Sequence, residues 1–181
     1  MSLPVIIQGG MGIGVSDWRL AKAVSILGQL GVVSGTGINT VLIRRLQDGD
    51  QQGDIRRAIG NFPDAEFAQE VLQLYFLPNG RSNGKSYKRC SLPSIDSPLS
   101  LQRLNALASF VEVFLAKENH SGIVGINFLE KLQTTNLSGI YGAMLAGVDY
   151  VLMGAGIPRE IPGVLDKFSA QNEASIKVTI I

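Results

Sequence analysis

The sequence has few of the residues that mark secreted, membrane or nucleic-acid-binding proteins. Its single cysteine, Cys90, excludes a disulfide within the chain and fits the reducing cytosol, so we expect a cytoplasmic protein. Lys and Arg number 16 against 15 Asp and Glu, and the net charge of +1 predicts binding neither to nucleic acid nor to a membrane. We find no apolar run long enough to span a bilayer and no basic leader of a secretion signal. The chain has one histidine, His120, and we predict no metal site.

Glycine and apolar residues are abundant instead. The 181 residues include 21 glycines, and 45% are hydrophobic against 17% charged, which is typical of one domain with a buried sheet. Three glycine-dense turns follow apolar runs, at Gly9–Gly14, Ser34–Gly37 and Met153–Gly156. Glycine lets the backbone approach a ligand closely, and such loops at the carboxyl ends of buried strands are where α/β folds bind cofactors.

The first part of the chain predicts a strand–helix–strand unit. Pro4–Gln8 is a continuous apolar run, as expected for a parallel strand buried on both faces. Ser16 or Asp17 can cap the following helix, and Gly28 can end it. The predicted buried face of this helix is Leu20, Ala23, Val24 and Leu27. Gly31–Ser34 is the second strand, reached by a right-handed crossover.

A long connection, Ile38–Ser121, follows. Thr40–Tyr75 has a helical pattern, and its predicted breaks are Gly49, Gly53 and Pro63. Pro78–Pro98 is rich in Pro, Gly and Ser and carries several basic residues, which favours a solvated surface loop; the alternative is a lid over an anionic substrate. Phe110–Ala116 resembles a strand locally, but an apolar stripe of helical spacing continues through it. The next strand also begins too soon for a parallel crossover, so we predict a helix.

Three further strands are expected after this connection. They are Ile123–Phe128, Val148–Met153 and Ile176–Ile181, with helices around Ile140–Ala146 and from about Pro158 to Ser169. An apolar strand with no neighbour on one side is an aggregation template. We therefore expect either that the last strand is the edge of a small doubly wound sheet or that the natural polypeptide continues past Ile181.

The glycine pattern decides between α/β folds. A Rossmann loop requires G-x-G-x-x-G with a carboxylate at the end of the second strand, but Val15 takes the third glycine position and strand two ends in Ser34-Gly35. A P-loop is excluded because no Gly-Lys-Ser/Thr follows. Glycine after several strands favours a (β/α)₈ TIM barrel. The expected fold is therefore the N-terminal part of one such barrel domain over residues 1–181, with about five of its eight strands and an enlarged helical connection at 38–121.

The opening Pro4–Gly12 motif, followed by Leu20–Ser25 and Leu30-Gly31, resembles the N-terminus of nitronate monooxygenases, formerly called 2-nitropropane dioxygenases. These are FMN-dependent TIM-barrel flavoenzymes. Gly125-Ile126-Asn127 resembles their third strand, and Gly154–Pro158 resembles the loop after their fourth strand. Residues 125–131, with the enlarged connection, also resemble the enoyl reductases of polyketide and polyunsaturated fatty acid synthases.

This resemblance implies a set of cofactor-binding residues. Backbone at Gly10, Met11 and Gly12 would lie against the isoalloxazine ring of FMN, and Ser34, Gly35 and Thr36 would line the second loop. Asn127 would offer its amide to the ring edge, and Lys131 would place a positive charge near the reduced flavin. Gly154 and Gly156 would leave room for the ring or the ribityl chain. The alternatives are plain turn glycines, a helix-capping Asn127 and a solvated Lys131.

The catalytic base of that family, a histidine on a later strand, has no counterpart, so the catalytic residues are left unassigned. His120 precedes a strand and is expected at the opposite end of the sheet. The resemblance implies a flavin monooxygenase that oxidises alkyl nitronates with O₂. One alternative is an NAD(P)H-dependent enoyl reductase acting on an enoyl thioester, and another is a truncated, non-catalytic fragment. A homodimer is left open.

Overall fold

The computed structural model describes residues 3–178, which form a three-stranded parallel sheet with seven helices. The strands are β1 (Gly31–Ser34), β2 (Val124–Leu129) and β3 (Tyr150–Gly154), in the order β1-β2-β3. The helices are α1 (Trp18–Ile26), α2 (Ile38–Gln47), α3 (Asp54–Ile59), α4 (Ala65–Tyr75), α5 (Leu99–Lys117), α6 (Gln133–Leu145) and α7 (Ile161–Ser169). The α/β class and the strands near 31, 124 and 150 agree with the sequence analysis.

The TIM barrel is wrong. The sheet is open, and in residues 3–178 it has three strands where the sequence predicted about five. Pro4–Gln8 is not a strand buried on both faces, because it joins β1 through one isolated bridge, Ile7 to Leu30. Of the predicted last strand, residues 176–178 have no strand conformation, and 179–181 lie outside the described residues. A closed barrel requires every strand to pair with a neighbour on both sides. Neither Pro4–Gln8 nor residues 176–178 forms such a strand.

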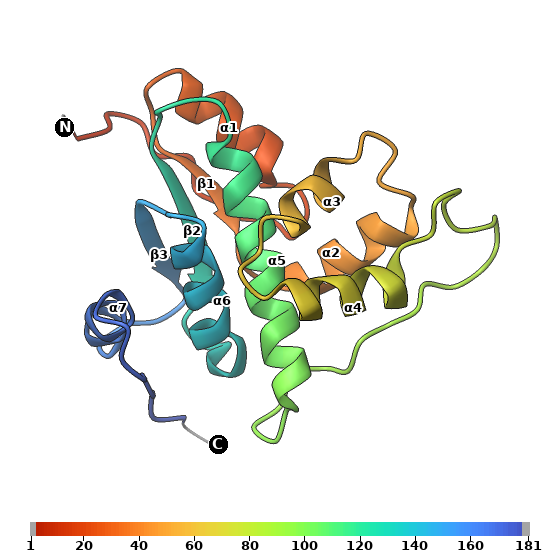
Figure 1. Cartoon of the computed structure of the whole chain (residues 1–181). Helices are drawn as coiled ribbons and strands as arrows, with labels where there is room; N and C mark the ends of the chain where they lie inside the picture. The colour runs from red at the N-terminus through yellow and green to blue at the C-terminus, as the bar shows by residue number, and fades with distance from the viewer. Residues whose placement is uncertain (1–2, 179–181) are drawn as a thin grey trace.

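The predicted buried face of α1 is also wrong. Its buried residues are Trp18, Ala21 and Ser25, whereas Leu20 is 40% and Leu27 77% exposed. The helix ends are as predicted: Asp17 accepts hydrogen bonds from the amides of Arg19 and Leu20, and Gly28 has a positive φ of 76°. A helical apolar stripe becomes buried only where another element covers it, and here α1 lies at the margin of the molecule (Figure 1).

The long connection is helical and carries the core. Its breaks fall where Gly49, Gly53 and Pro63 predict them, between α2, α3 and α4. The strand-like Phe110–Ala116 lies inside α5, as the helical stripe predicts. In Figure 1, α5 crosses the middle of the molecule, with α2, α3 and α4 on one side and the sheet and α6 on the other. Thirteen of its 19 residues are buried.

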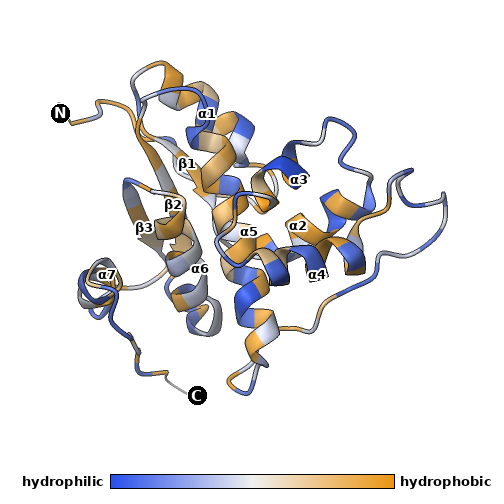
Figure 2. Cartoon of the chain, viewed as in Figure 1, coloured by the Kyte–Doolittle hydropathy of each residue, from blue (hydrophilic) through white to orange (hydrophobic). Residues whose placement is uncertain are grey.

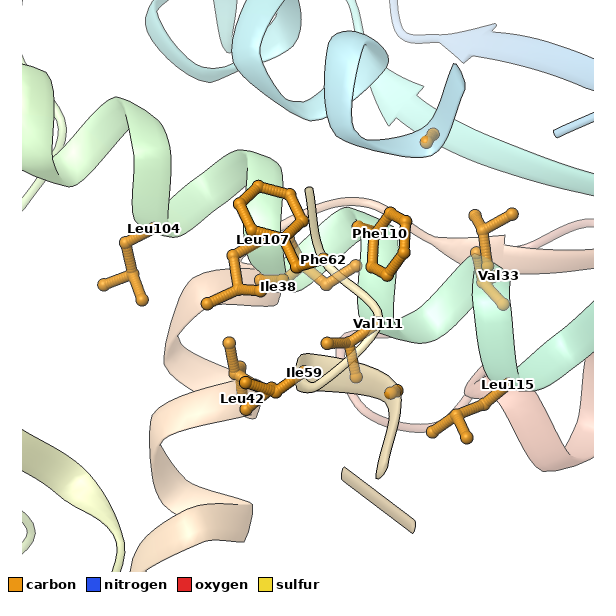
Figure 3. Packing of buried hydrophobic residues seen from close by; sticks show 14 of the residues in the cluster. Val33, Ile38, Leu42, Ile59, Phe62, Leu104, Leu107, Phe110, Val111 and Leu115 are labelled. Carbon is orange, nitrogen blue, oxygen red and sulfur yellow. The ribbon is translucent and has the colours of Figure 1, made fainter. Parts of the chain in front are cut away.

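Close packing around α5 is visible in Figure 3, where Leu107, Phe110 and Val111 face Ile38 and Ile59. The rings of Phe62 and Phe110 meet edge to face, with centroids 5.3 Å apart, a favourable aromatic geometry. Helix α5 is long and apolar enough to cross a membrane, contrary to the sequence analysis. However, 72% of its apolar window is buried inside the domain, as in the core helix of a soluble protein.

The basic loop between α4 and α5 lies along α2. The Tyr87 hydroxyl donates to Asp48 (2.8 Å), and the amide of Lys88 donates to Gln47 (2.7 Å). The guanidinium of Arg81 stacks on the Tyr87 ring, 4.2 Å from its centroid. Most of the loop is exposed, as expected for a solvated surface loop.

Candidate functional site

Four loops meet at the carboxyl edge of the sheet. Ser34, Asn127 and Leu152 are register partners across the three strands, so their side chains share the face opposite the α5 core. The amide of Gly35 donates to the carbonyl of Asn127, and the amide of Glu130 donates to the carbonyl of Gly154, both at 2.8 Å. These bonds hold the loops after β1, β2 and β3 together.

The loop after the bridge segment joins the same edge through Asn127. This side chain is 9% exposed, and its amide nitrogen donates to the carbonyl of Gly9 (2.7 Å) and contacts the Met11 sulfur (3.4 Å). The edge therefore brings together Gly9–Gly12, Ser34–Thr36, Asn127 and Gly154.

The other amide atom of Asn127, Oδ1, is buried and has no hydrogen-bond partner in the described part of the chain. Because the carbonyl of Gly9 is an acceptor, Nδ2 must face it, which leaves Oδ1 on the side of Gly154. A Cβ built on Gly154 would lie 3.8 Å from that oxygen and would meet nothing closer. A buried acceptor without a donor costs about 1–3 kcal/mol. The same condition holds for Trp18 Nε1, Arg81 Nε and Ser109 Oγ among the described residues.

Ser16 is a second anchor of the loop. Its hydroxyl donates to the carbonyl of Met11 (2.5 Å) and accepts from the side chain of Gln8 (3.1 Å). Its carbonyl accepts from the amide of Ser34 (2.8 Å), and Gln8 Oε1 accepts from the amide of Val32 (2.8 Å). The sequence analysis saw Ser16 only as a helix cap and did not assign a role to Gln8, because nothing in the local pattern reveals these tertiary bonds.

Three predicted cofactor glycines are required by the protein's own side chains. A Cβ on Gly10 would collide with Val32, one on Gly35 with the Phe128 ring and one on Gly156 with Glu130. Gly10 also has a φ of +64°, which non-glycine residues rarely adopt. Close packing against Val32 and Asn127 therefore accounts for this glycine, and a flavin ring is not needed to explain it. Gly154 differs, since an added Cβ would make only ordinary contacts of 3.8–3.9 Å and no collision.

The remaining predicted residues lie around this edge. Met11 is 58% exposed, Thr36 is half-buried, and Gly12 has only Val15 near its missing side chain. Lys131 is exposed on the turn before α6. None of these makes a contact that fixes a chemical role.

A cavity of about 360 Å³ lies beside the edge, between the end of β2, the start of α6 and the loop after β3. It is lined in part by Glu130, Asn136, Ile157 and Arg159. None of the ten predicted cofactor residues lines it. This cavity therefore lies beside the predicted cofactor residues and not among them.

A buried ionic cluster fixes the helix that follows the loop. Glu112 of α5 is 5% exposed; its carboxylate accepts from the amide of Trp18 (2.8 Å) and pairs with Arg45. Arg45 also pairs with Asp17 (3.2 Å). Burial raises the pKa of Glu112 above its ordinary value, and Arg45 opposes that rise only in part. Sequence reasoning missed this cluster because Glu112 interrupts an apolar stripe without any visible partner.

His120 lies at the opposite end of the sheet, as predicted. It precedes β2, with Nε2 2.6 Å from the carbonyl of Ala116 and Nδ1 accepting from the amide of Gly122 (3.0 Å). Across residues 3–178, no group of three or more His, Cys, Asp or Glu side chains could hold a metal ion. Comparisons with protein-family models, curated proteins and solved structures give no match to this chain.

Proposed function

We propose that the chain binds the ring of FMN at the carboxyl edge of the sheet and acts as a flavin-dependent oxidoreductase of the nitronate monooxygenase type. The observation that carries the proposal is the buried, unpartnered Oδ1 of Asn127 beside Gly154, where an added Cβ would make only ordinary contacts. An isoalloxazine ring presents an imide N–H, and its ribityl chain presents hydroxyls, and either is a donor for that oxygen. Bound flavin supplies the electron transfer.

The chain's own residues would orient and cover the ring. The bond from Asn127 to the carbonyl of Gly9 holds the loop in place, and the exposed Met11 side chain is free to lie on a flat apolar surface. Ser16 keeps the loop in this shape through its bonds to Met11 and Ser34. The half-buried, unpaired Cys90 supports a cytoplasmic location for such an enzyme.

A second candidate is a flavin-binding module without turnover. It is favoured by the position of His120 at the opposite end of the sheet, and by a neighbouring cavity that none of the predicted cofactor residues lines. A catalytic base must reach the substrate within hydrogen-bond distance, directly or through one water. Oxygen consumption with an alkyl nitronate supports the oxidoreductase. NADPH oxidation that depends on an enoyl thioester supports the enoyl reductase, and flavin binding without either supports the module.

The binding step is tested by titrating the purified chain with FMN and following flavin fluorescence. We expect saturable binding that weakens at least about tenfold in Gly154→Val, because valine fills the space beside Asn127. The matched control is Gly163→Ala in α7, where an added Cβ meets nothing within 4 Å and binding should be unchanged. Absence of FMN binding, or equal affinity in Gly154→Val, would contradict the proposal.

A further inference from the structure

The N-terminal segment carries an apolar surface that the rest of the chain leaves uncovered. Seven large apolar side chains in residues 3–15 are at least 56% exposed: Leu3, Val5, Ile6, Ile7, Met11, Ile13 and Val15. Figure 2 shows the segment that leads from the N-terminus as hydrophobic. A contiguous exposed apolar surface on a soluble domain usually marks an interaction site.

Helix α1 carries two further exposed apolar side chains near this segment. Ile26 and Leu27 are 59% and 77% exposed. The residues that follow them hold the N-terminal segment: Gln29 Oε1 accepts from the amide of Ile6 (2.8 Å), and the amide of Leu30 donates to the carbonyl of Ile6 (3.1 Å). We call residues 3–15 with the exposed side chains of α1 the N-terminal apolar surface.

The backbone of this surface has a free edge. The backbone N–H and C=O of Ile6 and the N–H of Gln8 form hydrogen bonds with Gln29 and Leu30. The N–H and C=O of Ile7 between them therefore point away from β1. Neither group of Ile7 has a partner within residues 3–178. Pro4 has no N–H and Gly10 turns the chain, so only a short strand can add at this edge.

The composition favours a second copy of the same chain as the occupant. Residues 1–16 contain no Asp, Glu, Lys or Arg. Two copies can therefore meet here without like-charge repulsion, and a charged partner would form no ion pairs with this segment. Antiparallel pairing of Ile7 with Ile7 of the other copy satisfies both free groups and closes under two-fold symmetry. Specific interfaces bury about 1,200–2,000 Å² in total, so a stable dimer requires most of these exposed side chains to be covered in both copies.

We propose that the chain forms a two-fold homodimer through the N-terminal apolar surface, with the Ile7 edges paired. This proposal does not depend on FMN binding. Met11 belongs both to this surface and to the loop proposed to cover the flavin. Given its small area, the dimer is expected to be of micromolar strength and to dissociate on dilution.

Sedimentation velocity across a dilution series tests this. We expect a monomer–dimer equilibrium in the unaltered chain, weakened at least about tenfold by Ile7→Glu, which places a charge in the interface. The control is Leu92→Glu, which adds the same charge to an aliphatic residue that is 89% exposed in the basic loop and should leave dimerisation unchanged. Ile7→Pro removes the free N–H but keeps an apolar side chain and should also weaken the dimer.

Far-ultraviolet circular dichroism of each variant verifies that the fold is retained. A monomer at every concentration would overturn the proposal, and so would open-ended growth beyond two copies. A dimer that is insensitive to both Ile7 variants, or that is lost in Leu92→Glu, would place the contact elsewhere and would equally overturn it.

Discussion

Two equally apolar regions of this chain have opposite structural outcomes. Helix α5 is buried along most of its length between the sheet and helices α2, α3 and α4. The opening segment, residues 3–15, is as apolar but exposes most of its large side chains. Hydrophobicity therefore predicts what would be favourable to bury, while burial itself requires a covering element. Helix α5 has such elements on both sides, whereas the described residues leave most of the opening segment uncovered.

The largest expected difference between the regions is in truncation of aliphatic side chains. Leu107 of α5 is fully buried, so Leu107→Ala should lower the free energy of unfolding by about 2–5 kcal/mol. Ile6 is 61% exposed, and Ile6→Ala should change it by less than about 0.5 kcal/mol. Urea denaturation at low protein concentration measures both. Similar losses in the two variants would contradict the contrast between the regions.

Adjacent glycines of the first loop offer a finer comparison. Gly10→Ala should destabilise the chain by roughly 2–4 kcal/mol, because the residue has a positive φ and its Cβ would collide with Val32. Gly9→Ala is the matched control: nothing lies within 4 Å of its added Cβ, and the change should be within about 0.5 kcal/mol. Thermal unfolding of the two variants distinguishes them. A tolerated Gly10→Ala would mean that the loop is not packed on Val32.

The smallest predicted effect concerns two carboxylates of the α5 region with opposite pKa shifts. Because burial raises the pKa of Glu112, the folded chain binds more protons than the unfolded chain above pH 4.5. Stability due to Glu112 therefore falls as pH rises through the window between 4.5 and its folded pKa. Glu112→Gln should remove that decline in the free energy of unfolding, as measured by urea denaturation across this pH range.

Glu118 provides the opposite sign. Its hydrogen bond with Arg57 lowers its pKa below the ordinary 4.5, so its contribution to stability is lost as pH falls below that value. Glu118→Gln should flatten only the acid side of the curve of unfolding free energy against pH. Since the pair is at the surface, this change should be a fraction of about 1 kcal/mol. Slopes of the same sign for both variants would contradict the assigned shifts.

Local patterns predicted the helices and the three strands well. Helix α5 was identified from its stripe and from the short distance to β2, and the turns at Gly49, Gly53 and Pro63 from their residues. The barrel was wrong because an apolar run such as Pro4–Gln8 gives no information on whether a neighbouring strand exists. The α1 face was wrong for the same reason: periodicity identifies an apolar side but not the element that covers it.

For the candidate site, the sequence indicates which loops lie near one another but not the contacts between them. Glycine loops after strands indicate the carboxyl edge, and the structure has Asn127 at that edge. Sequence spacing could not show which side chains the glycines pack against, because each contact joins residues that are more than 20 positions apart in the chain. The three contacts are Gly10 with Val32, Gly35 with Phe128 and Gly156 with Glu130. Ser16 and Gln8 were likewise not recognised as the anchors of the first loop.

The most direct test of the flavin site is the amide NMR spectrum of the chain during FMN titration. We predict saturable shifts at the side-chain amide of Asn127 and at the backbone amides of Gly9–Gly12 and Gly154, with Gly163 in α7 unchanged. Shifts confined to other regions, or no shifts at all, would contradict the proposal that the carboxyl edge around Asn127 binds a flavin.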